Sequence, residues 1–378
     1  MRIVGGRVLT PAGPVAGDVS VVDGRIAPSG GGCIFDARGL LVLSGIVDIH
    51  GDAFERQIQP RPGVDFPIGL ALEETERQLL ANGITTAFHG ATLSWEPGLR
   101  SAQTWRALLD GLAARTWDCD MRVHLRWEAY NLDALDMAIA DITAGRVHLL
   151  AFNDHTPAIL RRLDDPAKAS KYSERGPLSL DEFRSVAQAV GARAREVPAG
   201  LARIAAAARA AELPMASHDD DSVAARDAFR AMGAGICEFP MEEDVGIAAR
   251  AAGDAVIMGS PNVVRGKSHL GWASAARLAE AGTCSVLSSD YYYPCLLRAP
   301  FVLAGRGALD LAASWALVSA NPARAAGLTD RGEIVDGKRG DLIVVDDRAG
   351  VPHVVATMVA GRIVQMAAEA FARIGGGQ

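Results

Sequence analysis

The chain has 378 residues, of which 49% are hydrophobic and 22% charged, and its formal net charge is −7. This balance excludes the broad basic surface of a protein that binds nucleic acid or anionic membranes without specificity. The five cysteines lack paired spacing, and neither an apolar leader nor a run of about 20 apolar residues occurs. We therefore expect a cytoplasmic protein without disulfides, nucleic acid or membrane contact.

Both ends of the chain are rich in short β runs. In residues 1–45 they are separated by Gly, Pro and Asp-Gly turns, and residues 332–378 repeat the pattern, most clearly at 341–346 and 354–364. Because a different pattern lies between them, the two ends predict one small β-sandwich domain made from residues 1–45 and 332–378.

The middle of the chain, residues 46–331, alternates between apolar strand-like runs and Ala- and Leu-rich stretches with helical spacing. The predicted strands are 46–50, 83–89, 122–128, 147–153, 215–218, 235–239, 255–258 and 284–289. Typical helical stretches are 70–80, 102–114, 132–142 and 223–232, and two helices are expected after Leu178. This alternation predicts an α/β fold with a (β/α)8 TIM-like barrel. A doubly wound open sheet is the alternative, but no GxGxxG follows the first strand.

Polar side chains follow several of these strands, where the active sites of such barrels lie. His50 and Asp52 are two residues apart at the end of a buried strand, so they face the same side of an extended backbone. Such a pair can begin a metal site or only hydrogen-bond a loop. His218 and Asp290 end two later strands in the same way, and Glu128 ends the third. A carboxylate there could bridge two metals or form a buried ion pair with Arg126.

Other residues near this rim have weaker assignments. His155 and His269 are further candidate ligands, whereas His124 and His148 fall near the start of their strands and are interpreted as structural. Asp219 and Asp220 follow His218 and could orient it or cap a helix, and so could Asp221. The residues expected to bind substrate phosphate are Arg61, Arg265, Lys267 and Asn262, with Arg56 and Arg126 as additional basic groups nearby.

Together these motifs resemble the amidohydrolase superfamily. The resemblance rests on HxD after the first strand, the acidic residue after the third, His after the fifth, Asp after the eighth, and the stretches 321–324 and 340–346. Four more stretches, 60–64, 218–221, 261–266 and 289–292, resemble its branch of ribosyl phosphonate triphosphate diphosphatases. Ala53, Lys267 and Tyr293 depart from that branch, which leaves the exact substrate open.

The resemblance implies a metal-dependent hydrolase that cleaves a phosphoanhydride of a ribosyl phosphonate 5-triphosphate and releases pyrophosphate. One or two divalent ions are expected, with zinc first and manganese or iron as alternatives. His50, Asp52, Glu128, His218 and Asp290 would hold them, and Asp290 would also act as the base. Hydrolysis of a cyclic amide or another C–N bond is one rival, and a non-catalytic barrel scaffold is another. The sequence does not determine the oligomeric state, and a homo-oligomer is one of the alternatives.

Overall fold

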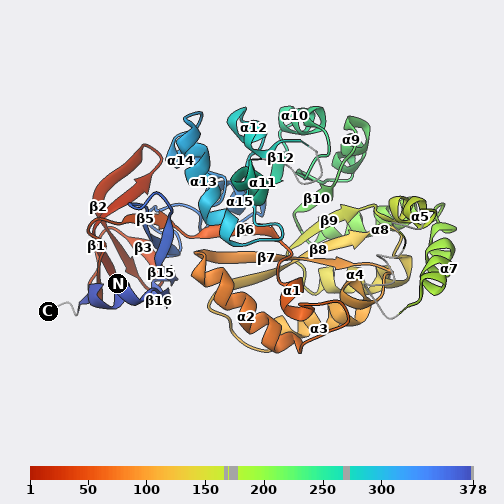
Figure 1. Ribbon diagram of the computed structural model, residues 1–378, viewed down its shortest axis with the longest axis horizontal. Helices are drawn as coiled ribbons and strands as arrows, with labels where there is room; N and C mark the ends of the chain where they lie inside the picture. Colours follow the sequence, from red (N-terminus) through yellow and green to blue (C-terminus); the bar gives the residue numbers. More distant parts are fainter. Residues whose placement is uncertain (166–168, 170–177, 267–272, 376–378) are drawn as a thin grey trace.

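The computed structural model describes residues 1–165, 169, 178–266 and 273–375. Two parts are visible in Figure 1: a sheet domain that contains both termini, and a larger α/β barrel with helices around its strands. The predicted fold class, a TIM-like barrel with a small β-sandwich domain from both chain ends, is confirmed. In the part of the chain that the structure describes, no helix is long and apolar enough to cross a membrane.

The barrel strands pair in chain order, each parallel to the next. They are β6 (Ile46–Gly51), β7 (Ile84–Leu93), β8 (Asp120–Glu128), β9 (Leu149–Asn153), β10 (Met215–His218), β11 (Ile236–Glu238), β12 (Ala255–Gly259) and β13 (Val286–Ser288). A bridge between Gly51 and Asp290 brings the first and last strands together. Most strand residues are buried, as expected when helices cover the outside of a parallel sheet.

Helices follow the strands around the barrel. They are α1 (Glu55–Ile58), α2 (Ile68–Ala81), α3 (Ala102–Ala113), α4 (Leu135–Thr143), α5 (Thr156–Leu163), α7 (Leu180–Gly191), α8 (Val197–Ala210), α9 (Val223–Ala231), α10 (Glu243–Ala251), α11 (Ser260–Arg265), α12 (Ala275–Glu280), α13 (Pro294–Arg306), α14 (Leu311–Ala316) and α15 (Ala320–Ala325). The two helices expected after Leu178 are α7 and α8. Ser179 and Glu182 form a capping box that starts α7, because each side chain bonds the other residue's backbone amide.

The terminal domain is a nine-stranded sheet in the described residues, in the order β16-β15-β14-β5-β1-β2-β3, with β4 pairing β1 and β17. Its strands are β1 (Arg2–Thr10), β2 (Gly13–Val22), β3 (Arg25–Ala27), β4 (Ile34–Asp36), β5 (Leu41–Ser44), β14 (Leu342–Asp346), β15 (His353–Val359), β16 (Arg362–Met366) and β17 (Ile374–Gly375). The antiparallel pairing of β5 with β14 joins the two chain ends.

The chain leaves the terminal sheet after Ser44 and enters the barrel at Ile46. Leu43 and Ile343 of the terminal sheet belong to the same hydrophobic cluster as Ile46 and Ile84 of the barrel. The exact limits at residues 45 and 332 stay a prediction, but this shared core fixes the barrel against the terminal sheet. The carboxyl ends of the barrel strands are thereby left to form the site.

Candidate active site

Glu238, the last residue of β11, lies at the centre of three buried imidazoles. His50 Nδ1 and His218 Nδ1 are 3.1 Å and 3.3 Å from the same oxygen, Glu238 Oε2, and His124 Nε2 is 3.7 Å from Oε1. A carboxylate that accepts hydrogen bonds from Nδ1–H favours the tautomer in which Nε2 carries the lone pair. Glu238 therefore orients His50 and His218 so that the lone pair of each ring is on Nε2.

Burial keeps these imidazoles neutral. Desolvation lowers the pKa of His50 to about 3 and that of His124 to about 3, and it lowers the pKa of His218 well below its usual value. Desolvation also raises the pKa of Glu238 to about 7, although His124 opposes this. A neutral imidazole is the form that binds a metal ion, so the burial that shifts these pKa values also prepares the donors.

His50 Nε2 is the clearest ligand atom of the site. It is buried and has no hydrogen-bond partner among the described residues. A Cβ added at Gly90 would lie 3.7 Å from this nitrogen, so the glycine places no side chain against it. Buried polar atoms are nearly always paired, and an unpaired imidazole nitrogen fits a metal ion. This residue set therefore suits the divalent ion that the sequence predicts.

Arg126 brings a positive charge into the same space. Its Nη2 is 2.9 Å from His218 Nε2, and its Nη1 is 3.6 Å from Asp52 Oδ2. The Arg126 side chain is 8% exposed, so its charge is only weakly screened by water. The guanidinium thus offsets part of the negative charge that Asp52 and its neighbours bring to the site.

Asp290 and Asp52 lie where the barrel closes. The Asp290 N–H donates to His50 O over 3.0 Å, and the Asp52 N–H donates to Asp290 O over 2.9 Å. Asp290 has a φ of 54°, and a Cβ at Gly259 would lie 3.0 Å from its Oδ2. Burial, followed by repulsion from Asp52, raises the pKa of Asp290 to about 7. A carboxyl group whose pKa lies near 7 can accept or donate a proton near neutral pH.

Glu128 does not join the imidazoles around Glu238. Its Oε1 accepts hydrogen bonds from the Thr156 N–H and Oγ1, and its Oε2 accepts one from the His155 N–H. The His155 ring also faces it, with Nδ1 3.6 Å from Oε2. Glu128 therefore anchors the start of α5 and His155, which differs from the predicted role of a carboxylate between two metals. Its ligand role stays a prediction.

Asp219 differs from the two aspartates that follow it, because its carboxylate lies near two histidine rings. Its Oδ1 is 3.4 Å from His218 Nε2 and its Oδ2 is 3.5 Å from His155 Nε2. Asp220 turns away, because it accepts a hydrogen bond from Ser217 and lies 3.8 Å from the buried Arg226. Asp221 is exposed. Among the residues that the structure describes, two groups could hold a metal ion, namely His50, His124 and Glu238, and His155, His218 and Asp219.

Among the predicted phosphate-binding residues, Arg265 contacts Tyr291, the residue that follows Asp290. Its Nη1 is 3.3 Å from the hydroxyl of Tyr291, and Arg56 lies over the Tyr291 ring at 5.9 Å. Asn262 has a buried Oδ1 without a partner among the described residues. Arg61 is exposed, and no contact in the described residues connects it to Asp290. Lys267 and His269 lie outside the described residues.

Sequence reasoning left Glu238 unassigned and interpreted His124 as structural. Strand β8 begins at Asp120, two residues before the predicted start, so His124 lies at its middle. The His124 ring meets the His50 ring edge-on, with centroids 5.0 Å apart. The sequence pattern could have placed His124 near the site, because His124, Arg126 and Glu128 alternate along one strand and therefore lie on the same face of it. His148, in contrast, accepts a hydrogen bond from the Val123 N–H, which agrees with a structural role.

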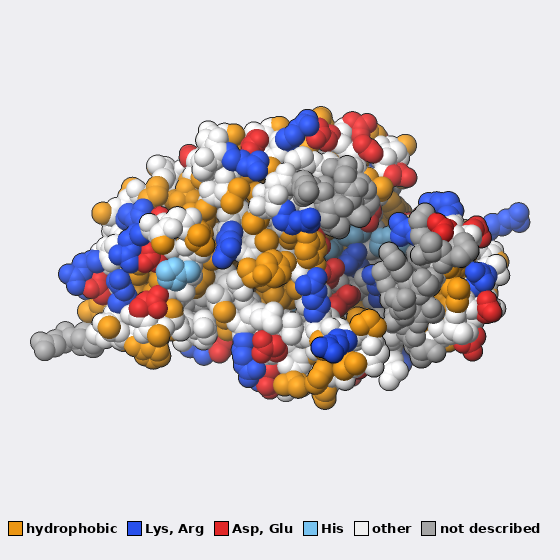
Figure 2. All heavy atoms as spheres, viewed as in Figure 1, with side chains coloured by type: hydrophobic (Ala, Val, Ile, Leu, Met, Phe, Trp, Pro, Cys, Tyr) orange, Lys and Arg blue, Asp and Glu red, His pale blue; other side chains and the backbone are white. Residues whose placement is uncertain are grey.

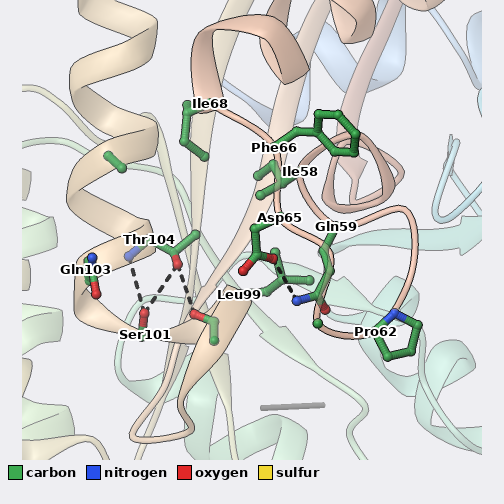
Figure 3. Close-up of a pocket in the computed structure, with 13 residues that line it drawn as sticks. Ile58, Gln59, Pro62, Asp65, Phe66, Ile68, Leu99, Ser101, Gln103 and Thr104 are labelled. Atoms are coloured by element: carbon green, nitrogen blue, oxygen red, sulfur yellow. Dashed lines mark hydrogen bonds between the residues drawn. The ribbon is translucent and has the colours of Figure 1, made fainter. Parts of the chain in front are cut away.

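The site is reached from one face of the barrel. Figure 2 shows histidine side chains within a recess of that face, with basic and acidic side chains beside them. A separate cavity of about 600 Å³ lies between the loop after α1 and the start of α3 (Figure 3). Ile58, Phe66 and Leu99 line it together with the hydrogen-bonded pair Gln59–Asp65, and its lining includes none of the predicted metal ligands.

The amidohydrolase family model matches residues 250–365. The chain is 31% identical over 332 residues to the alpha-D-ribose 1-methylphosphonate 5-triphosphate diphosphatase of Escherichia coli (strain K12), covering 84% of this chain and 87% of that protein. Among solved structures, 5-methylcytosine deaminase from Klebsiella pneumoniae matches with a TM-score of 0.63 at 15% identity, covering 97% of this chain and 98% of that one. Molinate hydrolase matches with a TM-score of 0.61 at 16% identity, over 96% and 94% of the two chains.

The two structural matches share the fold, and the Escherichia coli relative shares sequence along most of both chains. That relative supports hydrolase activity, which speaks against the scaffold alternative. The chain belongs to the amidohydrolase family and resembles its diphosphatase branch.

Proposed function

We propose that this hydrolase cleaves a phosphoanhydride bond in the 5-triphosphate of a ribosyl phosphonate and releases pyrophosphate, with the help of a divalent metal ion. The observation that carries the proposal is the unpartnered Nε2 of His50, held in place by Glu238 beside Asp52 and Asp290. The name of the Escherichia coli relative supports the substrate class, because the two chains align over most of their length.

His50, Asp52, His218 and Asp290 would hold the ion, with zinc first and manganese or iron as alternatives for this nitrogen and oxygen donor set. When bound, a divalent ion supplies Lewis acidity and makes water more acidic. Glu238 contributes by fixing the rings of His50 and His218, because both Nδ1 atoms bond its carboxylate.

Asp290 would accept the proton of the attacking water. Its position suits this task, because its backbone is hydrogen-bonded to His50 and Asp52, which places its carboxylate beside the proposed ion. Arg126 would stabilise the negative charge that builds on the phosphoryl oxygens. Arg265 would bind the phosphate oxygens that Arg126 does not reach, and Asn262, Arg61 and Lys267 are further proposed contacts.

Phosphorus NMR tests the proposal directly. The protein is incubated with a ribose 5-triphosphate that carries a methylphosphonate at C1, and the products are followed with time. We expect pyrophosphate and a 5-monophosphate to appear together with the unmodified protein. Neither product should appear with Asp290→Asn, whereas both should appear with the exposed control Asp221→Asn.

Two other outcomes would contradict this function. Inorganic phosphate as the first product would move the attack to the terminal phosphate. If the protein contains bound metal and the spectrum stays unchanged, hydrolysis of a C–N bond becomes the better-supported activity for this protein.

A further inference from the structure

We propose that Asp48 is a positioning residue for the reaction, because its carboxylate joins the first and last barrel strands next to His50 and Asp290. Asp48 lies in β6, and its side chain is fully buried. This role rests on the proposed function, since it fixes a proposed metal ligand relative to the proposed base. Three observations carry it: the short pairing of the two strands, the hydrogen bonds of Asp48, and the close packing around the glycine beside them.

The first and last strands of the barrel pair over a short distance. Between residues 46–51 and 286–290, all of which the structure describes, the pairing is a single bridge that joins Gly51 and Asp290. Earlier along both strands, the N–H groups of Val47 and Leu287 instead donate to carbonyls of residues 317–318, over 2.9 Å and 2.8 Å. A regular parallel ladder would have evenly spaced bonds along this whole length. The seam where the barrel closes therefore has few backbone bonds to fix the position of Asp290.

Asp48 supplies further bonds across this seam with its side chain. Its Oδ1 accepts one hydrogen bond from the Ser289 N–H over 3.1 Å and a longer one from the His50 N–H over 3.4 Å. A hydrogen bond to a carboxylate is stronger than one to a neutral acceptor, so this side chain can take the place of a ladder bond. One oxygen thus holds the backbone of a proposed ligand and of the residue before the proposed base.

Two backbone bonds continue this link into the active site. The Asp290 N–H donates to His50 O over 3.0 Å, and the Asp52 N–H donates to Asp290 O over 2.9 Å. Asp290 has a φ of 54°, which is uncommon for a residue with a side chain and persists only where the surroundings enforce it. The Ser289 amide that Asp48 binds comes immediately before this residue. A shift at Ser289 would therefore move the Asp290 carboxylate relative to His50.

The packing around Gly51 leaves the Asp48 side chain little freedom to move. A Cβ at Gly51 would lie 2.8 Å from Asp48 Oδ2, 2.8 Å from Ser289 Oγ and 3.3 Å from Tyr293 Cε1. Only a glycine fits there without a shift of these atoms. Side chains from the first strand and from the segment after the last strand thus pack closely around one glycine at the end of β6.

A purely structural role for Asp48 predicts a different outcome from a positioning role. Loss of a structural bond lowers stability, but the molecules that stay folded keep their kcat. Loss of a positioning bond lowers kcat in folded protein, since a displacement of about 1 Å can lower the rate about 100-fold. Asn321 provides the matched control, because its Nδ2 donates to Ser285 O over 2.9 Å and so holds the start of the same last strand.

The test compares Asp48→Ala, Asp48→Ser and Asn321→Ala with the unmodified protein, at a temperature at which circular dichroism shows each to be folded. Steady-state release of pyrophosphate gives kcat and KM. We expect both Asp48 variants to lower kcat about 10- to 100-fold and to change KM less than about threefold, because neither side chain reaches the two amides. Asp48→Asn keeps an oxygen acceptor in place and should recover most of the kcat. Asn321→Ala should lower the melting temperature and keep kcat.

Three results would overturn the positioning role. An unchanged kcat in Asp48→Ala and Asp48→Ser, together with a lower melting temperature, would make Asp48 a structural residue only. An equal fall of kcat in Asn321→Ala would show a general loosening of the barrel. A loss in Asp48→Asn as large as in Asp48→Ala would assign the effect to charge rather than to the hydrogen bonds. If Asp48→Ala does not fold, Asp48→Ser, which keeps a polar group at this position, decides.

Hydrogen–deuterium exchange separates this role from the proposed function. Peptides that cover residues 286–293 should exchange faster in Asp48→Ser than in Asn321→Ala, whether or not the phosphonate is a substrate. Calorimetric titration with Zn²⁺ should show an affinity about tenfold lower in Asp48→Ser, with the stoichiometry unchanged. These two changes without turnover by the unmodified protein would keep the role of Asp48 and reject the proposed function. Turnover by the unmodified protein, with unchanged exchange in Asp48→Ser, would do the reverse.

Discussion

The imidazole rings of His50 and His218 stack with their centroids 5.2 Å apart, although His50 belongs to the first barrel strand and His218 to the fifth. One carboxylate oxygen of Glu238, at the end of the sixth strand, accepts hydrogen bonds from Nδ1 of both rings. Phe239 packs edge-on against both rings, at 4.8 Å and 5.3 Å. The orientation of these two proposed ligands therefore depends on Glu238 and Phe239, which follow each other at the end of the sixth strand.

The orienting role of Glu238 can be tested with Glu238→Gln. We expect metal affinity to fall 10- to 100-fold, because the amide cannot accept hydrogen bonds from two Nδ1–H groups through a shared anionic oxygen. Calorimetric titration with Zn²⁺ measures the change. The exposed Glu242→Gln serves as the control, and equal affinities in the two variants would show that Glu238 does not orient the ligands.

Asp290→Asn tests the proposed base. We expect kcat to fall by about 10² to 10⁴, the usual contribution of a positioned acid or base, while the protein stays folded. Steady-state release of pyrophosphate measures it. A rise in KM with kcat unchanged would instead assign Asp290 to substrate binding.

Arg265→Gln tests the proposed phosphate contact at the rim. We expect KM to rise about tenfold with a smaller change in kcat, because a charge-assisted hydrogen bond to phosphate contributes about 1.5–3 kcal/mol. Arg277→Gln is the control, since Arg277 is an exposed arginine that pairs with Glu243. If both variants behave alike, Arg265 does not contact the substrate.

Asp120 and Arg331 provide a prediction about stability and pH. Asp120 Oδ2 is 2.6 Å from Nη1 of the buried Arg331, and the carboxylate also pairs with Arg122. Burial alone would raise the pKa of Asp120, but Arg122 and Arg331 together hold it below its usual value of 3.8. Because the folded-state pKa is lowered, the stabilisation is complete above the unfolded-state pKa and is lost as the pH falls through the folded-state pKa.

We therefore expect Asp120→Asn to lower the free energy of unfolding by about 2 kcal/mol at pH 7, and by less below about pH 4. Urea unfolding at pH 7 and pH 3 measures the difference. Asp118→Asn, which removes a more exposed partner of Arg362, should change stability by less than about 1 kcal/mol. A deficit in Asp120→Asn that is the same at both pH values would exclude the ion pair as its cause.

Much of this organisation could be predicted from the sequence. Apolar runs alternating with helical stretches predict the barrel, because parallel strands buried on both faces need continuous apolar residues. The carboxyl ends of such strands meet at one rim, so strand order alone groups His50, Asp52, His218 and Asp290. The order of the elements is a local property of the chain, and periodicity reports it.

The partners of these residues depended on the tertiary structure. Glu238, His124 and Arg126 join the site through the direction of their side chains and the register of neighbouring strands, which a shift of one residue would reverse. Glu128, whose predicted ligand role stays a prediction, faces the first amides of α5 and the His155 ring, which strand order does not specify. The sequence by itself determined which ligand types end the strands, because strand ends are local. Only the closed barrel decided which carboxylate stands behind which imidazole, because that choice is made between strands far apart in the chain.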